Sequence, residues 1–234
     1  MTIGTMAEKS LHAALKMHYA RPGDRLECTL AGSVIDILRP SNDPDVPDEC
    51  IEIQTRSLGA LKPKLAKLLD RCPIRIVHPI PYERTIVRVD ADGAILSRRK
   101  SPKRGTIYHL FPELVSLPHL LLHPHLTVEA ALIREEEILL DDGQGSWRRK
   151  HWSIYDRRLV EVVQTIRLTS AADFAALLPD SLPPIFDTLM LAETIHQPRR
   201  LAQKMVYCLR EIGVVEITGK QGRALLYARS ASIR

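Results

Sequence analysis

The segments Ser33-Val34-Ile35-Asp36-Ile37-Leu38 and Ile51-Glu52-Ile53-Gln54 decide the fold class of this chain. Both alternate β-branched residues with polar ones, which predicts strands at Ser33–Leu38 and Cys50–Thr55. The first segment follows another strand candidate, Arg25–Leu30, across the turn residues Ala31-Gly32, so a hairpin is expected. Because side chains alternate across a strand, the acid and the glutamine of the second segment share one face, while its isoleucines point into the core.

Helices are expected before and after these strands. Apolar residues recur at helical spacing in Glu8–Ala20 and again in Leu58–Leu69, where Pro63 is suited to the first turn of a helix. Further strands are expected at Ile74–Ile80 and Thr85–Val89. The order helix, three strands, helix, strand predicts a mixed α/β sheet flanked by helices. Beyond it, residues 97–105 are expected to form an exposed loop, Tyr108–Leu122 a helix, and Leu126–Leu140 a region that contains a strand.

A change of character near Thr169 predicts two domains, residues 1–168 and 169–234. In the second, Ser170 is expected to cap a short helix, and Pro198–Ile212 has one apolar face. The remaining elements are a helical segment, Ile185–Ile195, and two strands, Val214–Thr218 and Ala224–Ala228. The turn Gly219–Gly222 joins the two strands. Three helices followed by a hairpin resemble the winged-helix DNA-binding domains.

Composition narrows the class of protein. The chain has 234 residues, a formal net charge of +5, 45% hydrophobic residues and 26% charged residues, which indicates a globular chain. No apolar run approaches the roughly 18 residues of a membrane helix. The four cysteines form no C-x-x-C pair, which excludes zinc fingers and favours reduced thiols in a cytoplasmic protein. Glycine-rich phosphate loops are absent, and no organic cofactor is expected.

Two carboxylates inside apolar strands are the feature with a chemical interpretation. Asp36 and Glu52 are costly to bury unless they are paired, solvated or bound to a cation. Brought together on neighbouring strands, they would form an oxygen site suited to Mg²⁺ or Mn²⁺. The alternative is structural: these acids could pair with Arg25, Arg39 or Arg56, or lie on the wet face of an edge strand.

The order of these elements resembles the PD-(D/E)XK nuclease superfamily, which includes Holliday-junction resolvases and restriction endonucleases. The resemblance implies that Asp36 and Glu52 bind the metal ion, and that Glu8 of the first helix supports the site. Gln54 stands where the family usually has a lysine, as in the Glu-x-Gln branches. Lys62 or Lys64 on the next helix is our own candidate for supplying the missing cation.

Basic residues gather in segments that would contact a DNA backbone. They lie in residues 97–105, between the two tryptophans, on the predicted Pro198–Ile212 helix and in the following turn: Arg98, Arg99, Lys100, Lys103, Arg104, Arg148, Arg149, Lys150, Arg199, Arg200, Lys204, Lys220 and Arg223. The neutral Gln203 on the same helix is a further candidate for DNA binding. Simpler interpretations stay open. The first group would equally suit a solvated loop, the tryptophans could pin their segment to the core, and winged helices also bind proteins.

The sequence therefore predicts a metal-dependent DNA endonuclease that holds DNA with basic loops and a winged helix. The alternative is a non-catalytic DNA-binding or regulatory protein built on a degenerate nuclease fold. A homodimer is an open option, because many such nucleases dimerise to cut both strands. A zinc site at His119, His123 and His125 is disfavoured, because Pro118 and Pro124 break the helical spacing.

Overall fold

The structure is a computed structural model that describes residues 7–145 and 152–231, with residues 7–9 as backbone alone. The chain is an α/β protein whose large sheet is flanked by helices. It divides into two compact units. Unit 1 comprises residues 1–56, 77–107 and 130–166, and unit 2 comprises residues 57–76, 108–129 and 167–234. The expected domain boundary after residue 168 lies two residues after the point where the chain enters the last segment of unit 2, at residue 167. Unit 2 also includes two earlier segments, residues 57–76 and 108–129, that were expected in the first domain.

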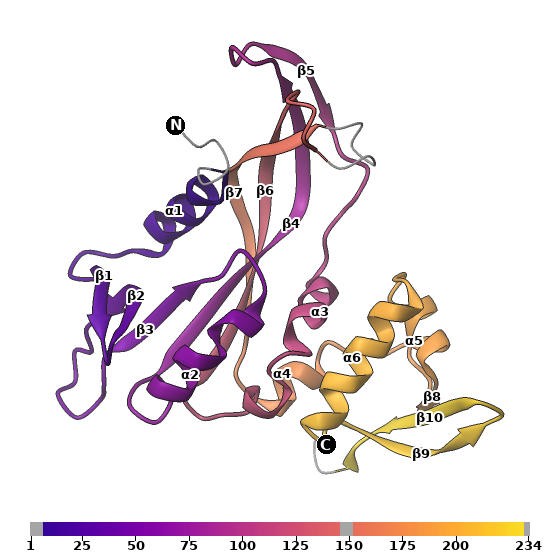
Figure 1. Ribbon diagram of the computed structural model, residues 1–234. Coiled ribbons are helices and arrows are strands. Elements are labelled where there is room, and N and C mark those ends of the chain that lie inside the picture. The colour runs from indigo at the N-terminus through magenta and orange to yellow at the C-terminus, as the bar shows by residue number, and fades with distance from the viewer. Residues whose placement is uncertain (1–6, 146–151, 232–234) are drawn as a thin grey trace. The chain divides into compact units, whose positions relative to one another are not determined.

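The large sheet has seven strands in the order β1-β2-β3-β4-β6-β7, with β5 paired to β4 (Figure 1). Their bounds are β1 Arg25–Leu30, β2 Ser33–Arg39, β3 Glu49–Ile53, β4 Ile74–Val89, β5 Ile95–Lys100, β6 Leu126–Leu140 and β7 Ser153–Leu168. The expected hairpin is confirmed: β1 and β2 are antiparallel around Ala31 and Gly32. Both turn residues have positive φ, 49° and 73°, as the tight primed hairpin turns require.

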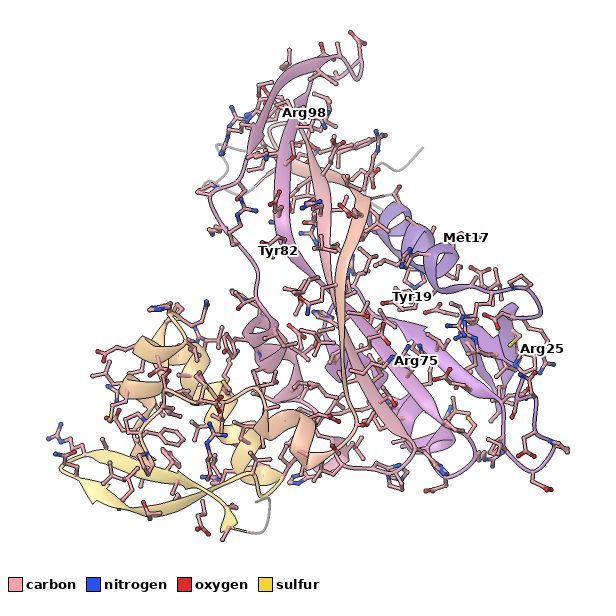
Figure 2. The ribbon with its side chains drawn as sticks, turned by 180° about the vertical axis from the view of Figure 1, so that it is seen from behind. Met17, Tyr19, Arg25, Arg75, Tyr82 and Arg98 are labelled. Atoms are coloured by element: carbon pink, nitrogen blue, oxygen red, sulfur yellow. The ribbon has the colours of Figure 1, made fainter. Side chains whose placement is uncertain are left out.

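Helix α1 (Ala7–Tyr19) covers β2 and β3 in unit 1 (Figure 1). Its Leu11 and Leu15 pack in one buried cluster with Ile37, Ile51 and Ile53 of the two strands. The apolar face of the helix and the apolar faces of the two strands thus form one hydrophobic core. Toward the end of α1, Tyr19 packs against this cluster and Met17 is exposed (Figure 2).

Unit 2 contains the remaining helices and a small antiparallel sheet in the order β8-β10-β9. Its bounds are η2 Leu58–Leu61, α2 Lys62–Leu68, η3 Ile107–Leu110 (mostly in this unit), α3 Phe111–Leu114, η4 Pro118–Leu120, α4 Ala171–Ala175, β8 Ile185–Phe186, α5 Thr188–Thr194, α6 Arg199–Glu211, β9 Val215–Gln221 and β10 Ala224–Arg229. Ser170 caps α4 through a capping box with Asp173, as expected, and Asp187 caps α5.

Several expected elements differ in the structure. Residues 97–105 were expected to be a loop, but β5 occupies Ile95–Lys100 and pairs with β4 across the Asp90–Gly93 turn. All six residues of β5 are exposed, so no apolar alternation marks it. The two strands expected at 74–80 and 85–89 are one strand, β4, which continues through Pro79 and Pro81. Proline fits a strand only where the β-ladder needs no backbone N–H. The two prolines therefore favoured two separate strands over one continuous strand.

Two more differences concern the middle of the chain. The helix expected at Tyr108–Leu122 is three short turns, η3, α3 and η4, because Pro112 and Pro118 each start a new turn. Strand β7 was not anticipated from the sequence. Buried and exposed residues do not alternate regularly along it, so it lacks the pattern that marks a strand with one buried face. No helix in the described part of the chain combines the length and the apolar character that crossing a membrane requires.

Candidate metal and nucleic-acid sites

The candidate metal site lies where β2 and β3 meet below helix α1 in unit 1. Ile37 pairs with Ile51 in the antiparallel ladder, and Asp36 directly precedes the first of these residues while Glu52 directly follows the second. The Asp36 Oδ2 accepts a hydrogen bond of 2.8 Å from the backbone N of Ile53. The same oxygen lies 3.2 Å from His12 Nε2 of α1. Backbone and helix together hold this carboxylate in place.

The acids of this site are largely removed from water. Glu52 is 3% exposed, and the side chain of Asp36 is 17% exposed. His12 keeps 30% of its side-chain surface, and Lys16, one turn later on α1, is buried. Low exposure strengthens electrostatic interactions between these groups, because little water is present to screen them.

The charges of the site act on His12. Its hydrogen bond with Asp36 raises the pKa of His12, burial lowers it, and the charges of Asp36 and Glu52 raise it further. The positive charge of Lys16 opposes them. Lys16 forms an ion pair with Glu27, which lowers the pKa of Glu27. His12 and Lys16, which sequence reasoning missed, therefore belong to the electrostatic surroundings of the two acids.

Two of the three arginines that were expected as structural partners of the acids bind other carboxylates. Arg25 pairs with Asp48 at 2.9 Å, and Arg39 pairs with Asp24 at 2.8 Å. Asp36 contacts a histidine on the helix. A His at position 12 is signalled in the sequence only by its spacing, four residues after Glu8, which puts both on one face of α1.

The other expected residues of the nuclease site are distributed as follows. Glu8 lies in α1, but its side chain is outside the described residues. Gln54 directly follows β3, and its side-chain Oε1 accepts a hydrogen bond from the backbone N of Arg56. Lys62 and Lys64 lie on α2 of unit 2, not on the elements that carry the acids. Among residues 7–145 and 152–231, no group of three or more His, Cys, Asp and Glu side chains is arranged to hold a metal ion.

The basic cluster of residues 98–104 is partly neutralised within unit 1. Arg98 pairs with Glu136, and Arg104 pairs with Glu83. The guanidinium of Arg104 also lies 5.7 Å from the ring centre of Tyr82. Figure 2 labels Tyr82 on β4 and Arg98 on β5. The exposed remainder of the cluster is Arg99, Lys100 and Lys103. Arg148, Arg149 and Lys150 lie outside the described residues.

In unit 2 the structure brings three of the expected DNA-binding residues around one pocket. Arg199 and Gln203 of α6 and Arg223 of the β9–β10 turn line a cavity of about 240 Å³. Tyr207 and Arg210 of α6 also line it, together with Thr188 and Tyr227; Tyr207 was not anticipated from the sequence. Arg200, Lys204 and Lys220 belong to the same elements but do not line the pocket.

Comparison with known proteins places the chain in a family. The family model described as "Domain of unknown function (DUF8091)" matches residues 9–169. The chain belongs to this family. A protein of Treponema pallidum (strain Nichols), described as uncharacterized, is 34% identical to it over 232 residues, which cover 98% of this chain and 88% of that protein. No solved structure matches. The DUF8091 match contains His12, Asp36 and Glu52, and it ends before the pocket on α6.

Proposed function

We propose that this DUF8091 protein is a nuclease that hydrolyses DNA phosphodiester bonds at Asp36 and Glu52 with Mg²⁺ or Mn²⁺. The observation that carries the proposal is the pair of poorly exposed carboxylates on the neighbouring strands β2 and β3, with His12 bound to one of them and the charges of both acting on it. The element order α1-β1-β2-β3-α2-β4 supports the PD-(D/E)XK resemblance. Mg²⁺ is commonly held by one or two carboxylates together with water and substrate phosphate, so a set of three protein ligands is not required.

Different residues of unit 1 would bind the metal ion and orient its ligands in such a site. Asp36 and Glu52 would hold the ion, which supplies charge neutralisation at the scissile phosphate and a more acidic bound water. The Ile53 N–H and His12 orient the Asp36 carboxylate, as outer partners orient metal ligands elsewhere. Lys16 adds a positive charge that acts on His12 and favours its neutral form.

Unit 2 would hold the substrate. We assign α4, α5, α6 and the β8-β10-β9 sheet to a winged helix, because three helices precede the hairpin and β8 pairs with its second strand. In that assignment α6 is the recognition helix and the β9–β10 turn is the wing. The arginines of both elements would contact phosphates.

A cleavage assay separates this proposal from the rival, a non-catalytic DNA-binding protein. Plasmid and single-stranded DNA are incubated with the full chain and Mg²⁺ or Mn²⁺, and the isosteric variants Asp36→Asn and Glu52→Gln are compared with wild type. Each variant should lose more activity than the roughly 10–100-fold that follows removal of an outer-shell partner of a metal ligand.

The matched control is Asp45→Asn, which removes the same charge from an exposed residue between β2 and β3. This variant should cleave like wild type. Absence of wild-type cleavage with either ion, or cleavage that persists in both site variants, would make the protein a binding protein rather than a nuclease.

A further inference from the structure

The pocket between α6 and β10 has a composition that a duplex backbone alone does not explain. Its walls combine three arginines with apolar side chains, among them Val206 and Leu225. Arg199 is held at the wall by a hydrogen bond from its Nε to Thr188 Oγ1, at 3.1 Å. The residues that line this pocket within the described chain include no carboxylate. The pocket therefore suits a ligand that is anionic on one side and apolar on the other.

An aromatic ring lies among these cations. Tyr207 is 37% exposed, and the guanidinium of Arg210 lies 5.9 Å from its ring centre. Arg210 donates a hydrogen bond of 2.8 Å to Glu211, so its charge is partly balanced. Arg199 of α6 and Arg223 of the β9–β10 turn add positive charge to the pocket from two different elements. A tyrosine beside arginines is the combination on which unstacked bases and their phosphates bind in single-strand binding proteins.

The form of the DNA follows from this chemistry. A duplex buries the faces of its bases and presents phosphates and base edges, which gain nothing from an apolar wall. An unpaired base offers its face to such a wall, and Gln203 can hydrogen-bond with its edge. The cavity of about 240 Å³ lies below the roughly 300–1,000 Å³ of pockets that enclose drug-sized ligands. It is suited to one base with its phosphate at the mouth.

We propose that this pocket binds one unpaired nucleotide of a DNA strand, with its base against Tyr207 and the apolar wall and its phosphate at Arg199 and Arg223. The inference rests on the proposed function, because it names the form of the substrate. It implies that the protein acts on DNA with a single-stranded segment, such as an end, a gap or a junction.

Binding is measured apart from cleavage, by fluorescence anisotropy in EDTA with the full chain. The probes are a labelled oligodeoxythymidylate and a blunt duplex of equal length. The single strand should bind more tightly, and Tyr207→Ala should weaken its binding by about 5- to 150-fold, the range for loss of one stacked base. Arg223→Gln should reduce the slope of log affinity against log salt by about 0.7, the value for one phosphate contact on a single strand.

Controls separate the pocket from general effects. Tyr207→Phe keeps the ring and should restore most of the binding that Tyr207→Ala loses. Met190→Ala, an exposed side chain of α5 outside the pocket, and Arg71→Gln, an exposed charge of unit 2, should also leave binding unchanged. Circular dichroism melting confirms that each variant folds. A folded Tyr207→Ala protein that binds the single strand normally, or a duplex bound as tightly as the single strand, would overturn the assignment.

The two proposals fail in different ways. Asp36→Asn should bind the oligodeoxythymidylate like wild type, because the pocket contains no residue of unit 1. Selective single-strand binding without any cleavage would refute the nuclease and keep the pocket. Metal-dependent cleavage without single-strand preference would refute the pocket and keep the nuclease.

Discussion

Asp36 shows how one side chain links the sheet to the helix above it. Its Oδ2 accepts the Ile53 N–H, a group that a β-ladder would normally supply with a backbone carbonyl, and it contacts His12 of α1. This one carboxylate therefore connects β2 both to the backbone of β3 and to helix α1. At this scale the fold and the candidate chemistry depend on the same atom.

The contact between His12 and Asp36 predicts a pH effect in the metal-free protein. Asp36 raises the pKa of His12, so protonated His12 is favoured in the folded state. The resulting stability is fully present below the pKa of an unfolded histidine, about 6.5, and is lost as the pH rises through the higher folded value. NMR titration of His12 should therefore give a midpoint above 6.5, which Asp36→Asn should lower. Asp45→Asn should leave it in place; an unchanged His12 midpoint in Asp36→Asn would contradict the contact.

At the scale of elements, Gly105 seats the chain after β5 against β4. Its N–H donates to the carbonyl of Pro81 at 2.9 Å, and a Cβ at this position would lie 2.5 Å from that oxygen and 2.8 Å from Ile80 Cγ2. Gly105→Ala should destabilise the protein by about 1–3 kcal/mol, the usual cost of overpacking, because backbone must move to admit the methyl group. Urea unfolding measures the change.

The matched variant for this experiment is Gly219→Ala on β9. Nothing lies within 4 Å of the position of its Cβ, so the substitution should cost little or stabilise slightly by restricting the unfolded chain. Equal losses for the two variants would mean that the close approach of Gly105 to β4 is wrong.

The elements also show what the sequence could and could not predict. Helix α1, the β1–β2 hairpin, β3, α4 and α6 follow from apolar period, turn residues and caps, and all are found within a few residues of the expected bounds. Strand β5 could not be predicted, because its exposed arginines follow no period and only pairing with β4 makes it a strand. The site was predicted in part. Asp36 and Glu52 are marked by their apolar neighbours, whereas His12 becomes notable only when packing sets α1 on the sheet.

At the scale of the whole molecule, charged groups differ between the two units rather than being spread evenly over the chain. The formal charge is only +5, yet buried carboxylates gather in unit 1 and an arginine-lined pocket lies in unit 2. A protein of uniformly weak basicity would bind DNA poorly and without orientation. Under the proposed function, the division would let one unit hold phosphate while the other concentrates the negative charge that attracts a cation.

This division predicts that binding and chemistry respond to different substitutions. With a single-stranded substrate and Mn²⁺, Tyr207→Ala should raise KM with kcat little changed, because a contact to a base that does not react contributes equally to ground state and transition state. Glu52→Gln should lower kcat, because its carboxylate would act where charge develops at the phosphate. The two variants share no residue contact within either site, so their effects on log kcat/KM should add in the double variant. If Tyr207→Ala lowers kcat as strongly as Glu52→Gln does, the pocket acts at the reacting phosphate itself, and the assignment of separate roles to the two units is wrong.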